Sequence, residues 1–114
     1  MEGDKQHNDI LYIYHYMTMI HVACGIMYMP DHTILMGLRS KSGPNPYYWE
    51  FPGGQLEDDE TLEECLQREW IEELNLQVSI DRFLYTTIHK DISCHFFVGK
   101  IQDIENLRIN VHEY

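Results

Sequence analysis

The apolar pattern of the chain begins with a long run at positions 10–29, ILYIYHYMTMIHVACGIMYM, which is rich in β-branched and aromatic residues. This composition is typical of buried strand, so we expect one or two strands in it. A turn rich in polar residues at 29–33 and a second apolar run at 34–40 follow, and together they predict a hairpin. The segment 40–48, which contains a glycine and two prolines, is predicted to be a loop.

The second half of the chain combines one helix with further strands. The segment 62–74 carries apolar residues at the spacing of a helix face. The sequence TLEE at 61–64 has the form of a capping box, and Asn75 suits the left-handed position just after a helix end. Strands on both sides of one helix predict an α/β or α+β domain. The further strands are predicted at 76–87, 93–101 and 107–111.

The predicted helix carries carboxylates on its apolar face. At about 100° per residue, Glu69 and Glu73 fall inside the apolar stripe and Glu72 falls on its border. All three lie near the C-terminal end of the helix, where the macrodipole disfavours negative charge. Partial burial of such acids is costly unless a cation lies among them, and hard divalent cations prefer carboxylate oxygens. The pattern therefore favours a metal site, with a solvated acidic face as the alternative.

The charged positions around this helix match the Nudix signature G-x5-E-x7-R-E-U-x-E-E-x-G-U, in which U is a bulky apolar residue. The chain resembles this family from near Thr18 to its end, and WEFPGG before the signature resembles its MutT-like branch. Two positions depart from the pattern, because Asn75 replaces the late glycine and Trp70 replaces an aliphatic residue. The charged and glycine positions in register are Gly54, Glu60, Arg68, Glu69, Glu72 and Glu73.

The resemblance also implies a fold and a division of the chain. It implies a Nudix-like α/β/α sandwich with a mixed β-sheet over residues 17–114. Residues 1–16 are expected to form a partly flexible N-terminal extension. The fold of the family usually continues with a further strand and a closing helix, and we expect both to be absent because the chain ends at Tyr114.

The resemblance implies magnesium-dependent hydrolysis of a nucleoside diphosphate linked to a further group, with Mn²⁺ as a substitute for Mg²⁺. It assigns metal binding to the Gly54 carbonyl and to the carboxylates of the helix, and it makes Glu69 the first candidate for the general base. In the family a later acid acts as a further ligand or base, and Glu113 takes that position here, with a frayed terminal acid as the alternative. The implied metal ligands are Gly54, Glu69, Glu72, Glu73 and Glu113.

Other residues are implied to contact the substrate or to support the site. Gly53 and Gly54 would allow the phosphates a close approach to the backbone, and Arg39 would face them, with a solvated surface arginine as the alternative. Glu60 and Arg68 are expected to pair and to brace the loop against the helix. Trp49 could stack on a base, but we expect it to belong to the core.

Residues outside the signature that distinguish the branches of the family restrict the expected class of substrate. The proline typical of ADP-ribose hydrolases is replaced by Asp91, and the tyrosine typical of dinucleoside polyphosphate hydrolases is also missing. By elimination we expect a (deoxy)nucleoside triphosphate, cleaved to the monophosphate and pyrophosphate, and the sequence does not specify the base. The alternatives are a non-catalytic nucleotide-binding Nudix domain and, less favoured, an mRNA-decapping or dinucleoside polyphosphate hydrolase.

Composition restricts the partners and the compartment. The formal charge of −11, from 19 acidic and 8 basic residues, disfavours contact with nucleic acid or an anionic membrane. The run at 10–29 lacks flanking basic residues, so we interpret it as strand and not as a membrane span. Three widely spaced cysteines predict free thiols in a reducing compartment, most simply the cytoplasm. The sequence does not decide whether the chain forms a homodimer.

Overall fold

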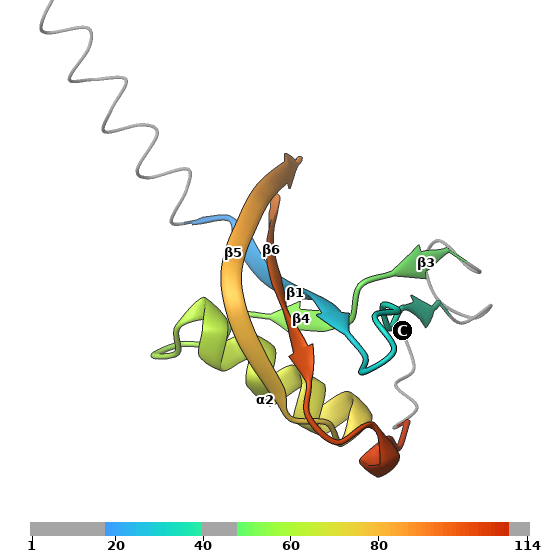
Figure 1. The fold of residues 1–114 in the computed structure, drawn as a ribbon. Helices are drawn as coiled ribbons and strands as arrows, with labels where there is room; N and C mark the ends of the chain where they lie inside the picture. The colour runs from blue at the N-terminus through green and yellow to red at the C-terminus, as the bar shows by residue number, and fades with distance from the viewer. Residues whose placement is uncertain (1–17, 40–47, 110–114) are drawn as a thin grey trace, which may run out of the picture.

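A mixed β-sheet and one helix organise the fold, as seen in a computed structural model that describes residues 18–39 and 48–109 (Figure 1). The strands of the main sheet are β1 (Ile20–Tyr28), β4 (Gly53–Gln55), β5 (Val78–His89) and β6 (Ile92–Ile101). Their order is β4-β1-β6-β5, with β1 and β6 parallel and the other two neighbouring pairs antiparallel. The predicted α+β domain with a mixed sheet is therefore confirmed.

The helix α2 spans Leu62–Leu74, as the sequence predicts. The backbone N–H of Glu64 donates to the Thr61 hydroxyl at 3.1 Å, and the Thr61 N–H donates to the Glu64 carboxylate at 2.8 Å. The helix ends at Asn75, whose φ of 56° is left-handed. Both ends are determined by side chains next to them in the sequence, which is why the pattern locates them correctly.

The hydrophobic core lies between α2 and one face of the main sheet. Trp70, Leu66 and Leu76 are fully buried, and Met27 of β1 packs among them. Burial of a side chain of this size stabilises the fold by roughly 1.5–3 kcal/mol. The core therefore holds α2 in a defined position against the centre of the sheet.

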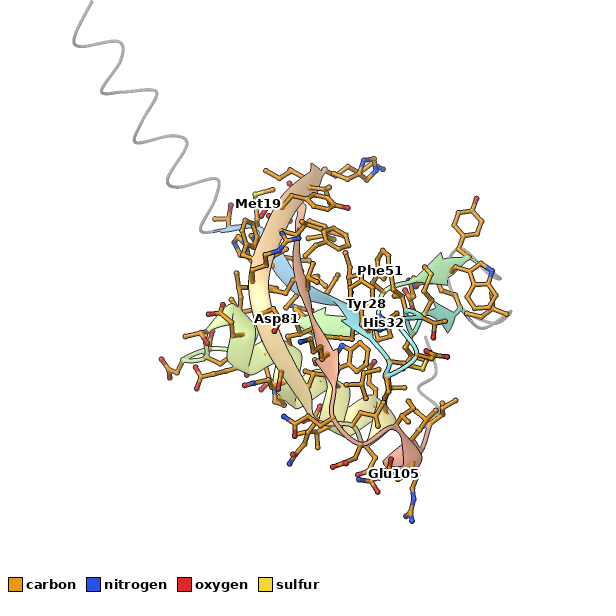
Figure 2. The ribbon with its side chains drawn as sticks, viewed as in Figure 1. Met19, Tyr28, His32, Phe51, Asp81 and Glu105 are labelled. Atoms are coloured by element: carbon orange, nitrogen blue, oxygen red, sulfur yellow. The ribbon has the colours of Figure 1, made fainter. Side chains whose placement is uncertain are left out.

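The opposite face of the sheet is only partly covered. Phe51, which is labelled in Figure 2, packs edge-on against Phe96 with ring centroids 6.1 Å apart. Tyr85 stacks on the same Phe96 ring, with centroids 4.8 Å apart. Within residues 18–39 and 48–109, α2 is the one α-helix, so the second helical layer of the expected α/β/α sandwich is not part of the described structure. The expected extension at 1–16 and the C-terminal residues 110–114 lie outside the described residues.

The predicted first hairpin forms only near its turn. Tyr28 and Ile34 make an isolated antiparallel bridge, but the predicted strand 34–40 is reduced to β2 (Gly37–Leu38). This strand pairs with β3 (Trp49–Glu50) in a separate two-stranded sheet and not with β1. The prediction is wrong in the length and partner of this strand because the chain turns away from β1 after the bridge.

A strand is predicted at 107–111, but residues 107–109, the part of it that the structure describes, do not form one. A 3-10 helix at Ile104–Asn106 follows β6, and residues 107–109 have no regular structure. The backbone N–H of Arg108 donates to the Leu74 carbonyl at 2.9 Å. This bond occupies an amide that a strand would use, and it ties the segment to the end of α2. No helix in the described part of the chain is long and apolar enough to cross a membrane.

Candidate active site

A cleft of about 680 Å³ lies between α2, β4 and the small β2–β3 sheet. Its volume is in the range of about 300–1,000 Å³ that small-molecule sites occupy. The expected site residues that line it are Arg39, Gly53, Gly54, Arg68, Glu69, Glu72 and Glu73. Glu60 contacts Arg68 beside the cleft, whereas Glu113 lies outside the described residues.

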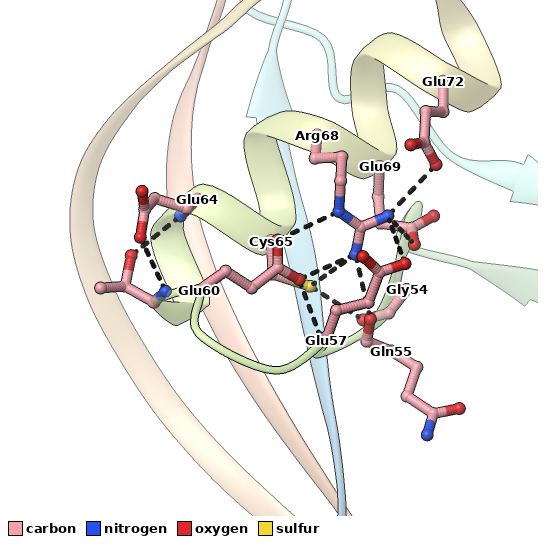
Figure 3. Close-up of polar contacts among 10 residues, drawn as sticks. Gly54, Gln55, Glu57, Glu60, Glu64, Cys65, Arg68, Glu69 and Glu72 are labelled. Carbon is pink, nitrogen blue, oxygen red and sulfur yellow. Dashed lines mark hydrogen bonds and ion pairs between the residues drawn. The ribbon is translucent and has the colours of Figure 1, made fainter.

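Arg68 is the centre of the polar contacts along this wall (Figure 3). Its Nε and Nη2 donate to the two carboxylate oxygens of Glu60 at 3.0 and 2.8 Å, and Nη2 also donates to the Gln55 carbonyl at 3.2 Å. Its Nη1 donates to Glu69 at 2.9 Å and to Glu72 at 3.2 Å. One guanidinium therefore connects the loop before α2 to two acids on the helix.

These hydrogen bonds keep the pair charged. The bonds from Arg68, followed by the backbone N–H of Glu57, lower the pKa of Glu60 to about 2. The hydrogen bonds that Arg68 donates to Glu60 raise the pKa of Arg68 further above its already high value. Because both groups stay ionised at neutral pH, the contact keeps its bidentate, charge-assisted form.

Glu73 has a different electrostatic environment. Burial of its side chain, followed by a hydrogen bond to Glu69 and by the charges of Glu69, Glu50 and Glu72, raises the pKa of Glu73 to about 8. Within the described residues, no lysine or arginine forms an ion pair with Glu73. Without a further cation, Glu73 therefore stays largely protonated at neutral pH.

The glycine pair brings the backbone of β4 close to these acids. Gly53 and Gly54 pair with Cys24 and Ala23 of β1. A Cβ atom on Gly53 would collide with the Ala23 carbonyl, and one on Gly54 would collide with the Glu69 carboxylate. Only glycine allows this approach, so the Gly54 backbone lies directly against the Glu69 side chain.

The oxygen donors that line the cleft beside Gly54 are of the types that a hard divalent cation prefers, but among the described residues no group of three or more His, Cys, Asp or Glu side chains is placed to hold a metal ion as it stands. Glu69, Glu72 and Glu73 offer carboxylate oxygens on one side of α2, and Gly54 adds a nearby backbone carbonyl. Oxygen donors of this kind suit Mg²⁺ and Mn²⁺. A cation would also supply the positive charge that Glu73 lacks among its described neighbours.

Arg39 lines the cleft on the side of the small sheet. Its Nη1 donates to the Glu50 carboxylate at 2.7 Å, and its side chain is 21% exposed. The expected contact of Arg39 with phosphates stays a prediction. Glu50 was not among the expected site residues, although its position in WEFPGG could have signalled a role.

Trp49 was expected in the core, but this prediction is wrong because its side chain is 65% exposed. Two further contacts were not expected from the sequence. The Trp70 indole N–H donates to the Pro52 carbonyl at 2.9 Å. The Cys65 thiol donates to the Gly54 carbonyl at 3.5 Å. Both contacts join the helix to β4 or to the turn before it. The periodicity of the helix alone does not predict them.

The family model named NUDIX domain matches residues 18–111 of this chain. The chain belongs to the Nudix family. The 8-oxo-dGTP diphosphatase of Proteus vulgaris is 34% identical over an alignment of 83 residues, and the match covers 69% of this chain and 74% of that protein. The CTP pyrophosphohydrolase of Escherichia coli K12 is 34% identical over 68 residues, which are 60% of this chain and 50% of that protein.

A solved MutT structure, from work on the Aliivibrio salmonicida and Vibrio cholerae proteins, has a TM-score of 0.62 and 25% identity. The match covers 82% of this Nudix chain and 79% of the MutT chain. The chain is therefore a MutT-like Nudix hydrolase, an enzyme that acts on pyrophosphate bonds. Nudix hydrolases generally use divalent metal ions.

Proposed function

We propose that this Nudix hydrolase is a magnesium-dependent pyrophosphohydrolase that converts a (deoxy)nucleoside triphosphate to the monophosphate and pyrophosphate. The observation that carries the proposal is that Glu69, Glu72, Glu73 and Gly54 all line the same cleft, with the Glu69 carboxylate directly against Gly54. The two relatives described above support the substrate class, because each is named for a nucleoside triphosphate. Their bases differ, so the proposal does not extend to the base.

The proposed metal ligands are Glu69, Glu72, Glu73 and the Gly54 carbonyl, with Glu113 as a further candidate. A bound Mg²⁺ or Mn²⁺ would neutralise phosphate charge and acidify a coordinated water. Arg68 orients the ligands through its bonds to Glu69 and Glu72. The brace between Arg68 and Glu60 in turn fixes the guanidinium.

In the proposed reaction the oxygen of water forms a bond to phosphorus while a phosphoanhydride P–O bond breaks and pyrophosphate leaves. A base must accept the proton of the attacking water. We assign this role first to Glu69, because Arg68 holds its carboxylate in one orientation and its side chain is only 15% exposed. Arg39 would bind phosphate oxygens from the opposite side of the cleft.

A direct test measures release of pyrophosphate with Mg²⁺ present from 8-oxo-dGTP, dGTP, CTP and dCTP. ADP-ribose, a dinucleoside polyphosphate and a capped RNA are tested in parallel by following their nucleotide products, because their hydrolysis releases no pyrophosphate. The proposal expects turnover of at least one triphosphate and little of the other classes. Binding of triphosphates with no turnover would contradict the proposal and favour the non-catalytic alternative.

A matched pair of variants tests the assignment of the acids. Glu72→Gln removes a proposed ligand, and Glu63→Gln makes the same change at an exposed position in the first turn of the same helix. We expect Glu72→Gln to lose roughly 100-fold or more in kcat. Glu63→Gln should retain the activity of the wild type. Equal activities of the two variants would contradict the role of Glu72.

A further inference from the structure

The indole of Trp70 does more than fill the core. Its ring is fully buried, and its Nε1–H donates to the Pro52 carbonyl at 2.9 Å. Pro52 lies in the turn between β3 and β4, and proline has no N–H of its own to fasten that turn. The carbonyl is therefore the group through which the protein can hold the turn backbone at this residue.

The same carbonyl also accepts a hydrogen bond from the Gly25 N–H of β1 at 2.9 Å. Both lone pairs of the Pro52 oxygen are thus used, one by the sheet and one by the helix. Gly25 also makes room for the indole, because a Cβ atom there would lie 2.9 Å from Trp70 Nε1. Gly25, Pro52 and Trp70 are therefore matched in shape and in hydrogen bonding.

Both residues of the Trp70–Pro52 contact lie close to proposed metal ligands in the sequence. Trp70 follows Glu69 in α2, and Pro52 precedes the glycine pair that ends with Gly54. The Glu69 carboxylate lies so close to Gly54 that a Cβ atom would not fit between them. A shift of the turn relative to the helix would therefore change this approach.

We propose that Trp70 is a positioning residue, whose indole N–H holds the Pro52 turn so that Gly54 stays against the Glu69 carboxylate. This inference rests on the proposed metal-dependent function. An aliphatic residue, which the signature has at this position, would fill the core but could not donate to Pro52. Trp70 thus gives this chain a link between the helix and the glycine turn that the signature itself does not provide.

The test compares two replacements of Trp70 that lack the N–H. Trp70→Phe leaves some volume empty, whereas site-specific replacement by benzothienylalanine keeps the shape of the indole with sulfur in place of N–H. Leu76→Val serves as the control, because Leu76 is fully buried in the same core and lies beyond the end of α2. Each protein is examined for Mn²⁺ affinity without substrate, for kcat and KM, and for thermal unfolding.

We expect both Trp70 replacements to weaken Mn²⁺ binding by roughly 10-fold and to lower kcat by a similar factor, as is typical when a residue that orients metal ligands is lost. KM for the triphosphate should change by less than about threefold, because the loss falls on the metal geometry and not on the nucleotide contacts. Leu76→Val should lower thermal stability while Mn²⁺ affinity and kcat stay at the wild-type level.

The outcomes separate the two proposals. If the benzothienylalanine protein binds Mn²⁺ and turns over as the wild type does, Trp70 is a packing residue and the inference is wrong, even if Trp70→Phe fails to fold. If the wild type binds Mn²⁺ but cleaves no triphosphate, the proposed function fails alone, and the Mn²⁺ affinities still decide the role of Trp70.

Discussion

The guanidinium of Arg68 holds both carboxylate oxygens of Glu60, through Nε at 3.0 Å and Nη2 at 2.8 Å. This bidentate contact leaves Nη1 to reach Glu69 and Glu72 on the helix. The orientation of two proposed metal ligands therefore depends on the planar, forked shape of one side chain, and not on its charge alone.

Arg68→Lys is expected to lower kcat although it keeps the positive charge. An ammonium group cannot make the parallel bonds to Glu60 and still reach Glu69, so we expect a loss of roughly 10-fold or more in kcat and in Mn²⁺ affinity. The control is Arg82→Lys, at an exposed position of β5 outside the cleft. Steady-state kinetics of both variants check the prediction, and equal kcat values would show that charge alone suffices.

Glu73→Gln is expected to stabilise the metal-free protein at alkaline pH. The pKa of Glu73 is raised from 4.5 to about 8 in the folded state, first by burial. The folded state therefore binds the proton more tightly than the unfolded state does, and stability falls as pH rises from about 4.5 to about 8. Neutral Gln removes this loss, which we expect to be about 1–2 kcal/mol at pH 9 once solvent screening is allowed for.

Urea unfolding in the presence of a chelator, at pH 5 and at pH 9, measures this effect of Glu73. The difference between variant and wild type should be small at pH 5 and should reach its full value at pH 9. Addition of Mg²⁺ at pH 9 should stabilise the wild type more than the variant, because binding to the folded state adds to its stability. A difference that does not change with pH would contradict the prediction.

Gly54→Ala is expected to weaken metal binding. The added methyl group would collide with the Glu69 carboxylate and force the side chain or β4 to move. We expect a loss of roughly 10–100-fold in Mn²⁺ affinity. Gly37→Ala is the control within the same cleft, because its methyl group would meet its nearest neighbours, atoms of Glu50, at 3.9 Å. Titration of both proteins with Mn²⁺, without substrate, checks the difference.

Glu50→Gln and Arg39→Gln are expected to change KM in opposite directions. Glu50 accepts from Arg39 at 2.7 Å and so competes with any phosphate for the same guanidinium. Its neutralisation should lower KM for the triphosphate severalfold, whereas Arg39→Gln should raise KM roughly 10-fold or more. The direction of the change in KM for Glu50→Gln is decisive, since an increase would mean that Glu50 orients Arg39 and does not compete for it.

The helix and the spacing of its acids were predictable because their signals are local. The capping box begins α2 after Thr61, and Asn75 ends it, so both boundaries depend on neighbouring residues. Once the helix is placed, its periodicity puts Glu69 and Glu73 toward the interior, and both side chains are partly buried in the structure. The signature then connects this face to the glycine turn.

The contacts that sequence reasoning missed join segments far apart in the chain. β2 pairs with β3 and not with β1, and this choice brings Arg39 to Glu50. His21 Nδ1 lies 2.9 Å from His95 Nε2 because β1 and β6 are parallel neighbours. No local pattern distinguishes these pairings from others that the same strands could make, so the sequence alone does not specify them.

The parallel pairing of β1 with β6, from Ile20 beside Ile92 to Tyr28 beside Lys100, bears on how the molecule is made. During synthesis from the N-terminus, β1 cannot form its longest pairing, the one with β6, until α2, β5 and β6 have been synthesised. Pairings between such distant segments have a high entropic cost and form slowly. A nascent chain that has emerged only as far as Leu74 therefore already contains all the charged residues of the signature, but the sheet that supports α2 is not yet complete.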